Sequence, residues 1–95
     1  MTHDHLDSIL KTAHCKQDKE GWSVVPDGGT LTLYAAHDGV SLNVGRVEAL
    51  RVDGEIVYAR TPKRELFALA RTDLFAVALE GAAASGQPAR RAGFG

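Results

Sequence analysis

Two Asp-Gly dipeptides, each flanked by alternating apolar and polar residues, constrain this chain more than any other feature. The first lies at positions 38–39, between the runs 30–37 and 40–44. Both central positions of a tight type I′ turn need positive φ, which Asp and Gly tolerate, so the pattern predicts a β-hairpin. A two-residue loop collects the apolar side chains on one face. The predicted pairs are His37 with Val40, Ala35 with Leu42, and Leu33 with Val44.

The second dipeptide, at positions 53–54, predicts a hairpin between the runs 47–52 and 55–60. The same loop geometry pairs Leu50 with Val57 on one face. The opposite face is also partly apolar, and it carries the interaction residues that we predict: Val47, Ala49, Ile56 and Tyr58. Gly45 lies where the apolar positions change from even to odd numbers, which indicates a bulge or sharp bend there.

An amphipathic helix is predicted in the N-terminal segment, residues 1–21. Leu6, Ile9, Leu10 and Ala13 follow the i, i+3, i+4, i+7 spacing of one helix face. Acidic residues precede this stripe and lysines follow it, as the helix dipole favours. Gly21 is available to end the helix.

The segment 62–80 has two interpretations. Thr61 and Pro62 could begin a C-terminal helix, or a turn at 62–64 could lead to strands over 65–70 and 74–79. We favour the strands, because two hairpins leave open edges that need partners. The expected fold is therefore mainly β (α+β), with the helix followed by a five- to six-stranded antiparallel meander. Its outline resembles small SH3-like and Sm-like barrels or rolls in architecture alone. The alternative is two hairpins packed with a C-terminal helix.

Length and composition indicate one domain in a chain of 95 residues with net charge −1 and a single cysteine. We expect the β-rich part over 22–81 and a disordered Ala/Gly/Arg tail over 82–95, which has too few large apolar groups to pack. No run is long enough to span a membrane, and one cysteine cannot form an internal disulfide. The cytoplasm is the expected location.

Residues that could carry chemistry do not form a recognisable site. His3, His5, His14 and Cys15 lack metal-ligand spacing, and adjacent helical residues such as His14 and Cys15 point about 100° apart. The glycines match no phosphate-binding loop. We therefore expect no catalytic residues, no metal and no cofactor, and a protein that is not an enzyme.

Surplus apolar surface favours a protein-interaction or assembly role, with a homodimer or another protein as the partner. The alternative is a nucleic-acid-binding barrel, in which basic side chains contact phosphates and Tyr34 and Tyr58 stack on bases. The basic residues that would do this are Arg46, Arg51, Arg60, Lys63, Arg64 and Arg71. Acidic residues interleaved among them reduce the positive field.

Overall fold

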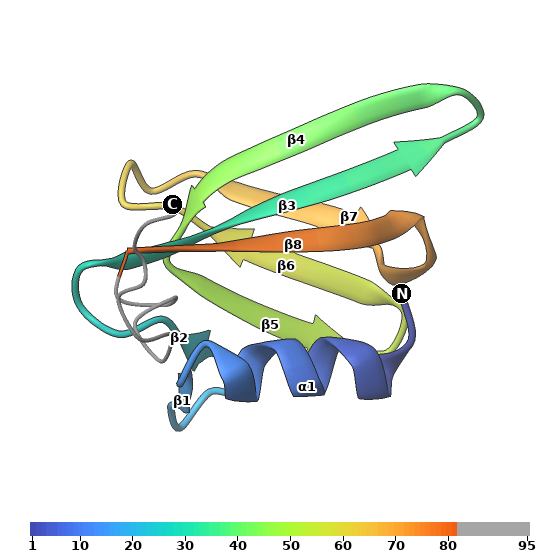
Figure 1. The fold of residues 1–95 in the computed structure, drawn as a ribbon. Coiled ribbons are helices and arrows are strands. Elements are labelled where there is room, and N and C mark those ends of the chain that lie inside the picture. The colour runs from blue at the N-terminus through green and yellow to red at the C-terminus, as the bar shows by residue number, and fades with distance from the viewer. Residues whose placement is uncertain (82–95) are drawn as a thin grey trace, which may run out of the picture.

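One helix and two antiparallel sheets form the part of the chain, residues 1–81, that the computed structural model describes (Figure 1). The predicted tail, 82–95, lies outside these described residues. The elements are α1 (His3–Thr12), β1 (Lys16–Gln17), β2 (Ser23–Val24), β3 (Gly29–His37), β4 (Val40–Val47), β5 (Ala49–Asp53), β6 (Ile56–Arg60), β7 (Leu66–Ala70), the 3₁₀ helix η1 (Arg71–Asp73) and β8 (Leu74–Gly81). The strand orders are β4-β3-β8 and β1-β2-β5-β6-β7.

The first hairpin, β3–β4, has the predicted register. His37 pairs with Val40, and the ladder continues through the two further predicted pairs. Asp38 and Gly39 have φ of 49° and 81°, which is the positive-φ pair that a type I′ turn requires. The alternating pattern and the turn residues together specified this element correctly.

A bulge interrupts the ladder at the predicted bend. Leu33 pairs with Val44, but Leu31 pairs with Val47, so β4 carries one extra residue at Gly45–Arg46. Arg46 takes the left-handed conformation there, with φ of 57°. Beyond the bulge the chain passes directly into β5, and one continuous segment thus belongs first to the three-stranded sheet and then to the five-stranded sheet.

The second hairpin, β5–β6, forms with a register that differs from the prediction by two residues. Asp53 pairs with Ile56 and Leu50 pairs with Ala59, so the loop residues are Gly54 and Glu55 rather than the Asp-Gly dipeptide. Gly54, with φ of 60°, occupies the first loop position, which is the glycine position of a type II′ turn. A shift of two residues leaves the side chains of the paired residues 49–53 and 56–60 on their predicted faces.

The helix is shorter than predicted, because it ends at Thr12 and not near Gly21. His14 adopts φ of 61°, its N–H donates to the Lys11 carbonyl, and the Cys15 N–H donates to the Leu10 carbonyl. These two bonds make a Schellman motif, with histidine in the place usually taken by glycine. After Ala13 the apolar stripe has no further member, so a longer helix would bury nothing more. Thr2 is the N-cap, accepting a bond from the His5 N–H.

The segment 62–80 forms two strands, and the alternative C-terminal helix is wrong. β7 pairs with β6, and after η1 the last strand, β8, returns to pair with β3. The predicted class, mainly β with an N-terminal helix, is confirmed. Within residues 1–81 no pairing joins β7 to β8, so the two sheets form an open roll and not a closed barrel.

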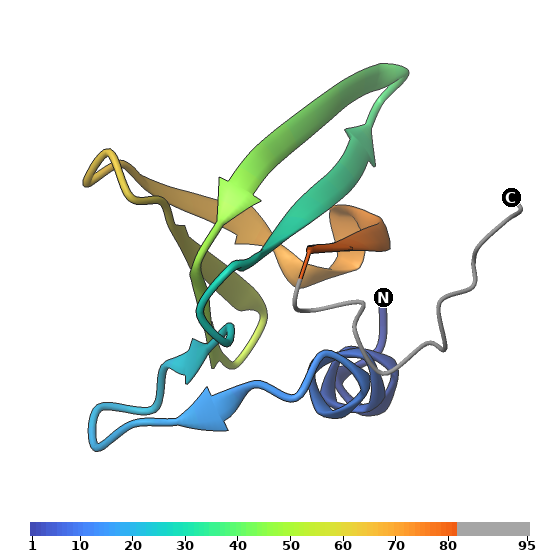
Figure 2. The same cartoon turned by 60° about the vertical axis from the view of Figure 1, so that its left-hand side comes forward.

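The core lies between the inner faces of the two sheets, and α1 covers one open side of it (Figure 2). Leu6, Leu10 and Ala13 of the predicted helical stripe are buried there. The largest side chains that are fully buried are Leu6, Leu31, Leu33, Leu50, Leu74, Val47 and Val57.

Truncation at Leu33, which is fully buried, should show how far stability depends on this core. We expect Leu33→Ala to lower the free energy of unfolding by about 2–5 kcal/mol, through lost transfer energy and a residual cavity. The matched control is Leu66→Ala, because Leu66 is 61% exposed. Urea unfolding followed by circular dichroism measures both, and equal losses in the two variants would contradict this description of the core.

Candidate interaction surfaces

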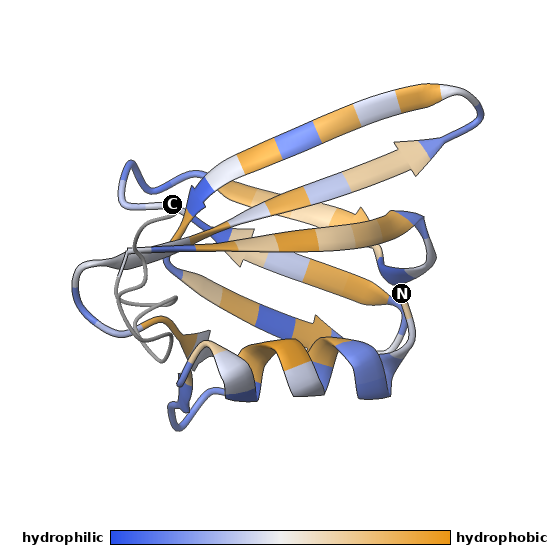
Figure 3. Cartoon of the chain, in the orientation of Figure 1, coloured by the Kyte–Doolittle hydropathy of each residue, from blue (hydrophilic) through white to orange (hydrophobic). Residues whose placement is uncertain are grey.

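An apolar row on the β3–β4 hairpin continues past the core into solvent. The core-side residues of β4 are 3% exposed at Val44, 47% at Leu42 and 69% at Val40. The hairpin projects beyond the other strands, and its hydrophobic residues alternate along β4 up to the turn (Figures 1 and 3). We call the two exposed residues Val40 and Leu42, together with the buried Ala35 that pairs with Leu42, the hairpin row. The five-stranded sheet covers this face of the hairpin at Val44 but does not cover it near the β3–β4 turn.

A shallow groove of about 210 Å³ lies beside the hairpin row. Its lining is mostly apolar, and it consists of Ala35, Ala36, His37, Val40, Leu42, Leu69 and Asp73. His37 Nδ1 lies 2.9 Å from Asp73 Oδ1, and its Nε2 lies 3.3 Å from Asp38 Oδ2. The Asp73 contact connects the end of the hairpin to η1, whereas the Asp38 contact lies within the hairpin turn.

The predicted interaction residues divide into two pairs. Val47 and Ala49 are fully buried, so the expectation that they line a surface is wrong for this chain. The bulge turns Val47 into the core beside Leu31, and the small Ala49 side chain lies between Val24 and Arg60 in the ladder. Ile56 and Tyr58 remain accessible on the outer face of the five-stranded sheet.

The outer face of the five-stranded sheet carries an aromatic and basic patch. Arg60 lies over the Trp22 ring, with its guanidinium carbon 4.8 Å from the ring centroid, and its Nε donates to Glu48 Oε2 at 3.1 Å. Tyr58 pairs with Arg51 on the neighbouring strand. We did not predict that Trp22 belongs to this patch, since its position depends on the short β1–β2 turn, where Asp18 Oδ1 accepts the Trp22 N–H.

The six basic residues of the nucleic-acid hypothesis do not form one surface. Arg71 holds the backbone, since its Nη1 donates to the Met1 carbonyl and its Nε to the Gly54 carbonyl. Arg60 is engaged by Trp22 and Glu48, as described above, and Arg51 is exposed on β5. The other three lie at or near the end of the molecule where the β6–β7 loop meets the bulge: Arg46, Lys63 and Arg64.

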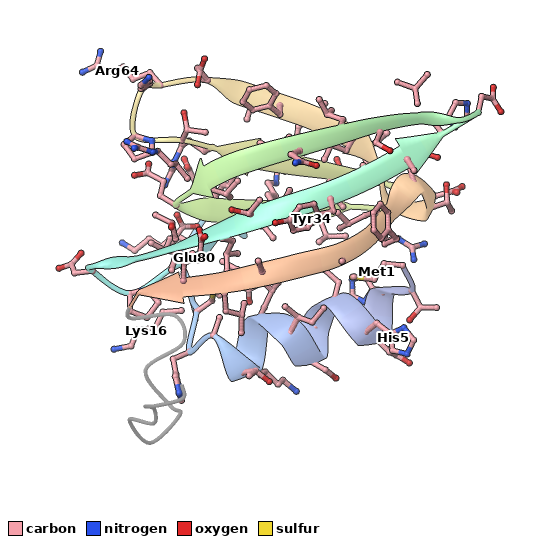
Figure 4. The ribbon with its side chains drawn as sticks, turned by 45° about the horizontal axis from the view of Figure 1, so that its top comes forward. Met1, His5, Lys16, Tyr34, Arg64 and Glu80 are labelled. Atoms are coloured by element: carbon pink, nitrogen blue, oxygen red, sulfur yellow. The ribbon has the colours of Figure 1, made fainter. Side chains whose placement is uncertain are left out.

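This basic end contains a pocket of about 320 Å³, bordered by Arg46, Lys63 and Glu65. Arg64 projects from the β6–β7 loop (Figure 4). Its φ is 64°, and like Arg46 it takes a left-handed conformation that is uncommon outside glycine. None of the salt bridges within residues 1–81 involves Arg46, Lys63 or Arg64.

Cys15 is half-buried at the end of α1, in a groove that also contains His3, Lys11 and Val52. Burial raises the pKa of the Cys15 thiol, because the thiolate is poorly solvated there. His14 is exposed on the turn that ends α1. In the described part of the chain, no three His, Cys, Asp or Glu side chains gather into a possible metal site.

Comparisons of the chain with protein-family models, with curated proteins and with solved structures found no match. Among residues 1–81, no helix has the length and apolar character needed to cross a membrane.

The raised pKa of Cys15 predicts a slow thiol. At neutral pH we expect the folded chain to react with iodoacetamide more slowly than the urea-unfolded chain, since less of the thiol is ionised. The rate should increase with pH, and the small stabilisation from the neutral thiol should be lost as pH rises through the folded pKa. Mass spectrometry of timed samples measures both rates. Faster alkylation of the folded chain would contradict the statement that burial suppresses ionisation of the Cys15 thiol.

Proposed function

We propose that this protein is a small interaction module that associates with itself through the hairpin row. The single observation that carries this proposal is the row itself, in which Leu42 and Val40 continue a core face but remain 47% and 69% exposed. Exposed apolar surface that continues a core and is bounded by polar groups is typical of protein contacts. A second copy offers the same row, so an isologous contact would cover both.

The strength of this association follows from what the row can bury. Complete burial of a fully exposed valine or leucine side chain is worth about 1.5–3 kcal/mol. Leu42 and Val40 are 47% and 69% exposed, so burial of their remaining surface in both copies is worth about 3–7 kcal/mol in total. Association costs about 4–15 kcal/mol in lost translational and rotational freedom. The row alone therefore supports a contact that depends on protein concentration, and additional backbone contacts would strengthen it.

A charged substitution in the row should separate the copies without unfolding them. We expect Leu42→Lys to give the mass of one chain at concentrations where the unchanged protein gives the mass of two, because an ammonium group buried in the contact would lose its hydration. Multi-angle light scattering after gel filtration measures the mass. Leu66→Lys, at an exposed position of β7, is the control and should keep the larger mass. A single-chain mass for the unchanged protein at millimolar concentration would refute the proposal.

Nucleic-acid binding is the second candidate function, and the basic end favours it. Arg46, Lys63 and Arg64 gather there free of ion pairs with the described acidic residues, and Trp22 lies nearby in a pocket that Arg60 and Arg64 share. Basic groups beside an aromatic ring suit a single strand. Glu48 and Glu65 border the same region and reduce its positive potential, so we rank this function below self-association.

Salt dependence tests this second candidate. If the three basic residues contact phosphates, the logarithm of the affinity for a single-stranded oligonucleotide should fall against log salt with a slope of about −2. Reversing charge in Lys63→Glu with Arg64→Glu should reduce that slope, whereas Lys11→Glu on α1 should not. Fluorescence anisotropy measures the affinity. A slope that these variants leave unchanged would exclude the basic end as the binding surface.

A further inference from the structure

The open edge of β4 has a residue order that can pair with itself. β4 is the last strand on its side of the three-stranded sheet, and within residues 1–81 no strand pairs with its outer side over Val40–Val44. The five residues there read Val-Ser-Leu-Asn-Val, with no charge, and their apolar and polar positions are the same in both directions. Open edges are usually protected by charged residues or proline. We infer that two copies join antiparallel along β4, about a two-fold axis at Leu42; this inference rests on the proposed self-association.

The hydrogen-bonding groups of β4 point the right way for such pairing. A two-residue loop closes on a hydrogen-bonded pair, here His37 and Val40, and such pairs alternate along an antiparallel ladder. The N–H and C=O groups of Val40, Leu42 and Val44 are therefore directed toward β3. Those of Ser41 and Asn43 are directed toward the open side, where a second strand can accept and donate.

These directions select one register within the regular part of the strand. When Leu42 lies opposite Leu42 of the second copy, Ser41 lies opposite Asn43, and both hydrogen-bonding residues of each copy are used. If one strand were shifted by one residue, residues whose N–H and C=O groups point outward would lie opposite residues whose groups point toward β3. Sliding by two would leave one outward residue against the turn at Asp38–Gly39 or against the bulge. The selected register also places Leu42 beside Leu42 and Val40 beside Val44, so the apolar side chains of the two copies contact each other across the junction and cover part of each hairpin row.

We call the junction between the two paired β4 strands the β4 seam. Charge complementarity at its two ends supports a second copy of the chain as the partner. The same register brings the turn residue Asp38 of one copy toward the bulge residue Arg46 of the other, and this occurs twice because of the two-fold axis. The Asp38 side chain is 89% exposed and Arg46 is exposed. An opposite pair at each end favours this antiparallel alignment over a parallel one.

The other uncharged edges fit a second copy less well. β7 and most of β8 also lack charge, but each carries only one of the large exposed hydrophobic residues, Leu66 and Phe75 respectively. β4 carries two of them, on the hairpin that projects clear of the other strands (Figure 2). The start of β8 is also occupied, because the N-terminal amine donates to the Leu74 carbonyl at 2.7 Å.

Disulfide trapping in the full chain tests the register. In a Cys15→Ser background, we would introduce Leu42→Cys, Ser41→Cys or the exposed control Thr72→Cys, and oxidise each variant under the same conditions. Leu42 would form a non-hydrogen-bonded pair with Cα atoms about 4.5 Å apart, which a disulfide can bridge. The two Ser41 positions would lie diagonally, about 7–8 Å apart. We expect Leu42→Cys to form the covalent dimer about 100-fold faster than Thr72→Cys, because pairing raises the effective thiol concentration.

Light scattering on the reduced variants distinguishes the proposed self-association from the proposed pairing along β4. A two-chain mass with fast trapping only at position 42 supports the β4 seam. A two-chain mass with trapping at Leu42→Cys no faster than at Ser41→Cys or Thr72→Cys overturns the seam and leaves self-association standing. A single-chain mass for the unchanged protein and the Cys15→Ser parent overturns self-association and the seam together.

Discussion

The bulge at Gly45–Arg46 is the constraint on which the rest of the structure depends. A regular strand would place Val44 and Val47 on opposite faces, because side chains alternate. The extra residue puts both in the core, and it turns the chain so that one segment pairs with β3 and then with β6. Arg46 accepts the left-handed conformation, a modest local strain that the two ladders on either side outweigh.

The exposed hairpin row is a geometric result of this turn. Because the chain turns between β4 and β5, the five-stranded sheet covers only the half of the three-stranded sheet that is farther from the β3–β4 turn. Leu31 and Leu33 lie in this half and are fully buried. The half that is nearer to the β3–β4 turn has the same alternation of apolar and polar residues, but the five-stranded sheet does not cover it. A row of this kind combines the specificity of a rigid scaffold with a small apolar area, which suits reversible contacts better than permanent ones.

Sequence patterns predicted the parts of this fold that depend on local chemistry. The register of the first hairpin was predicted to the residue. The register of the second hairpin differs by two residues, because a type I′ turn at Asp53–Gly54 and a type II′ turn that begins at Gly54 compete for the same Asp-Gly dipeptide. The helix end was missed because His14 took the conformation expected of Gly21. For the candidate surface, parity gave the face of Val40 but not its exposure, and it assigned Val47 to the outer face although the bulge turns this residue into the core. Whether a second layer covers a residue depends on where distant strands run, and no local pattern contains that information.

The position of β3 has a consequence for how the chain folds. One neighbour, β4, follows it directly through a two-residue turn, whereas the other, β8, is separated from it in the sequence by β4 and by three strands of the five-stranded sheet, β5, β6 and β7. Hairpins close within microseconds, but ladders between distant segments wait for a long loop to close. During synthesis on the ribosome, one side of β3 therefore stays without its partner until residues 74–81 emerge. The three-stranded sheet is thus completed last.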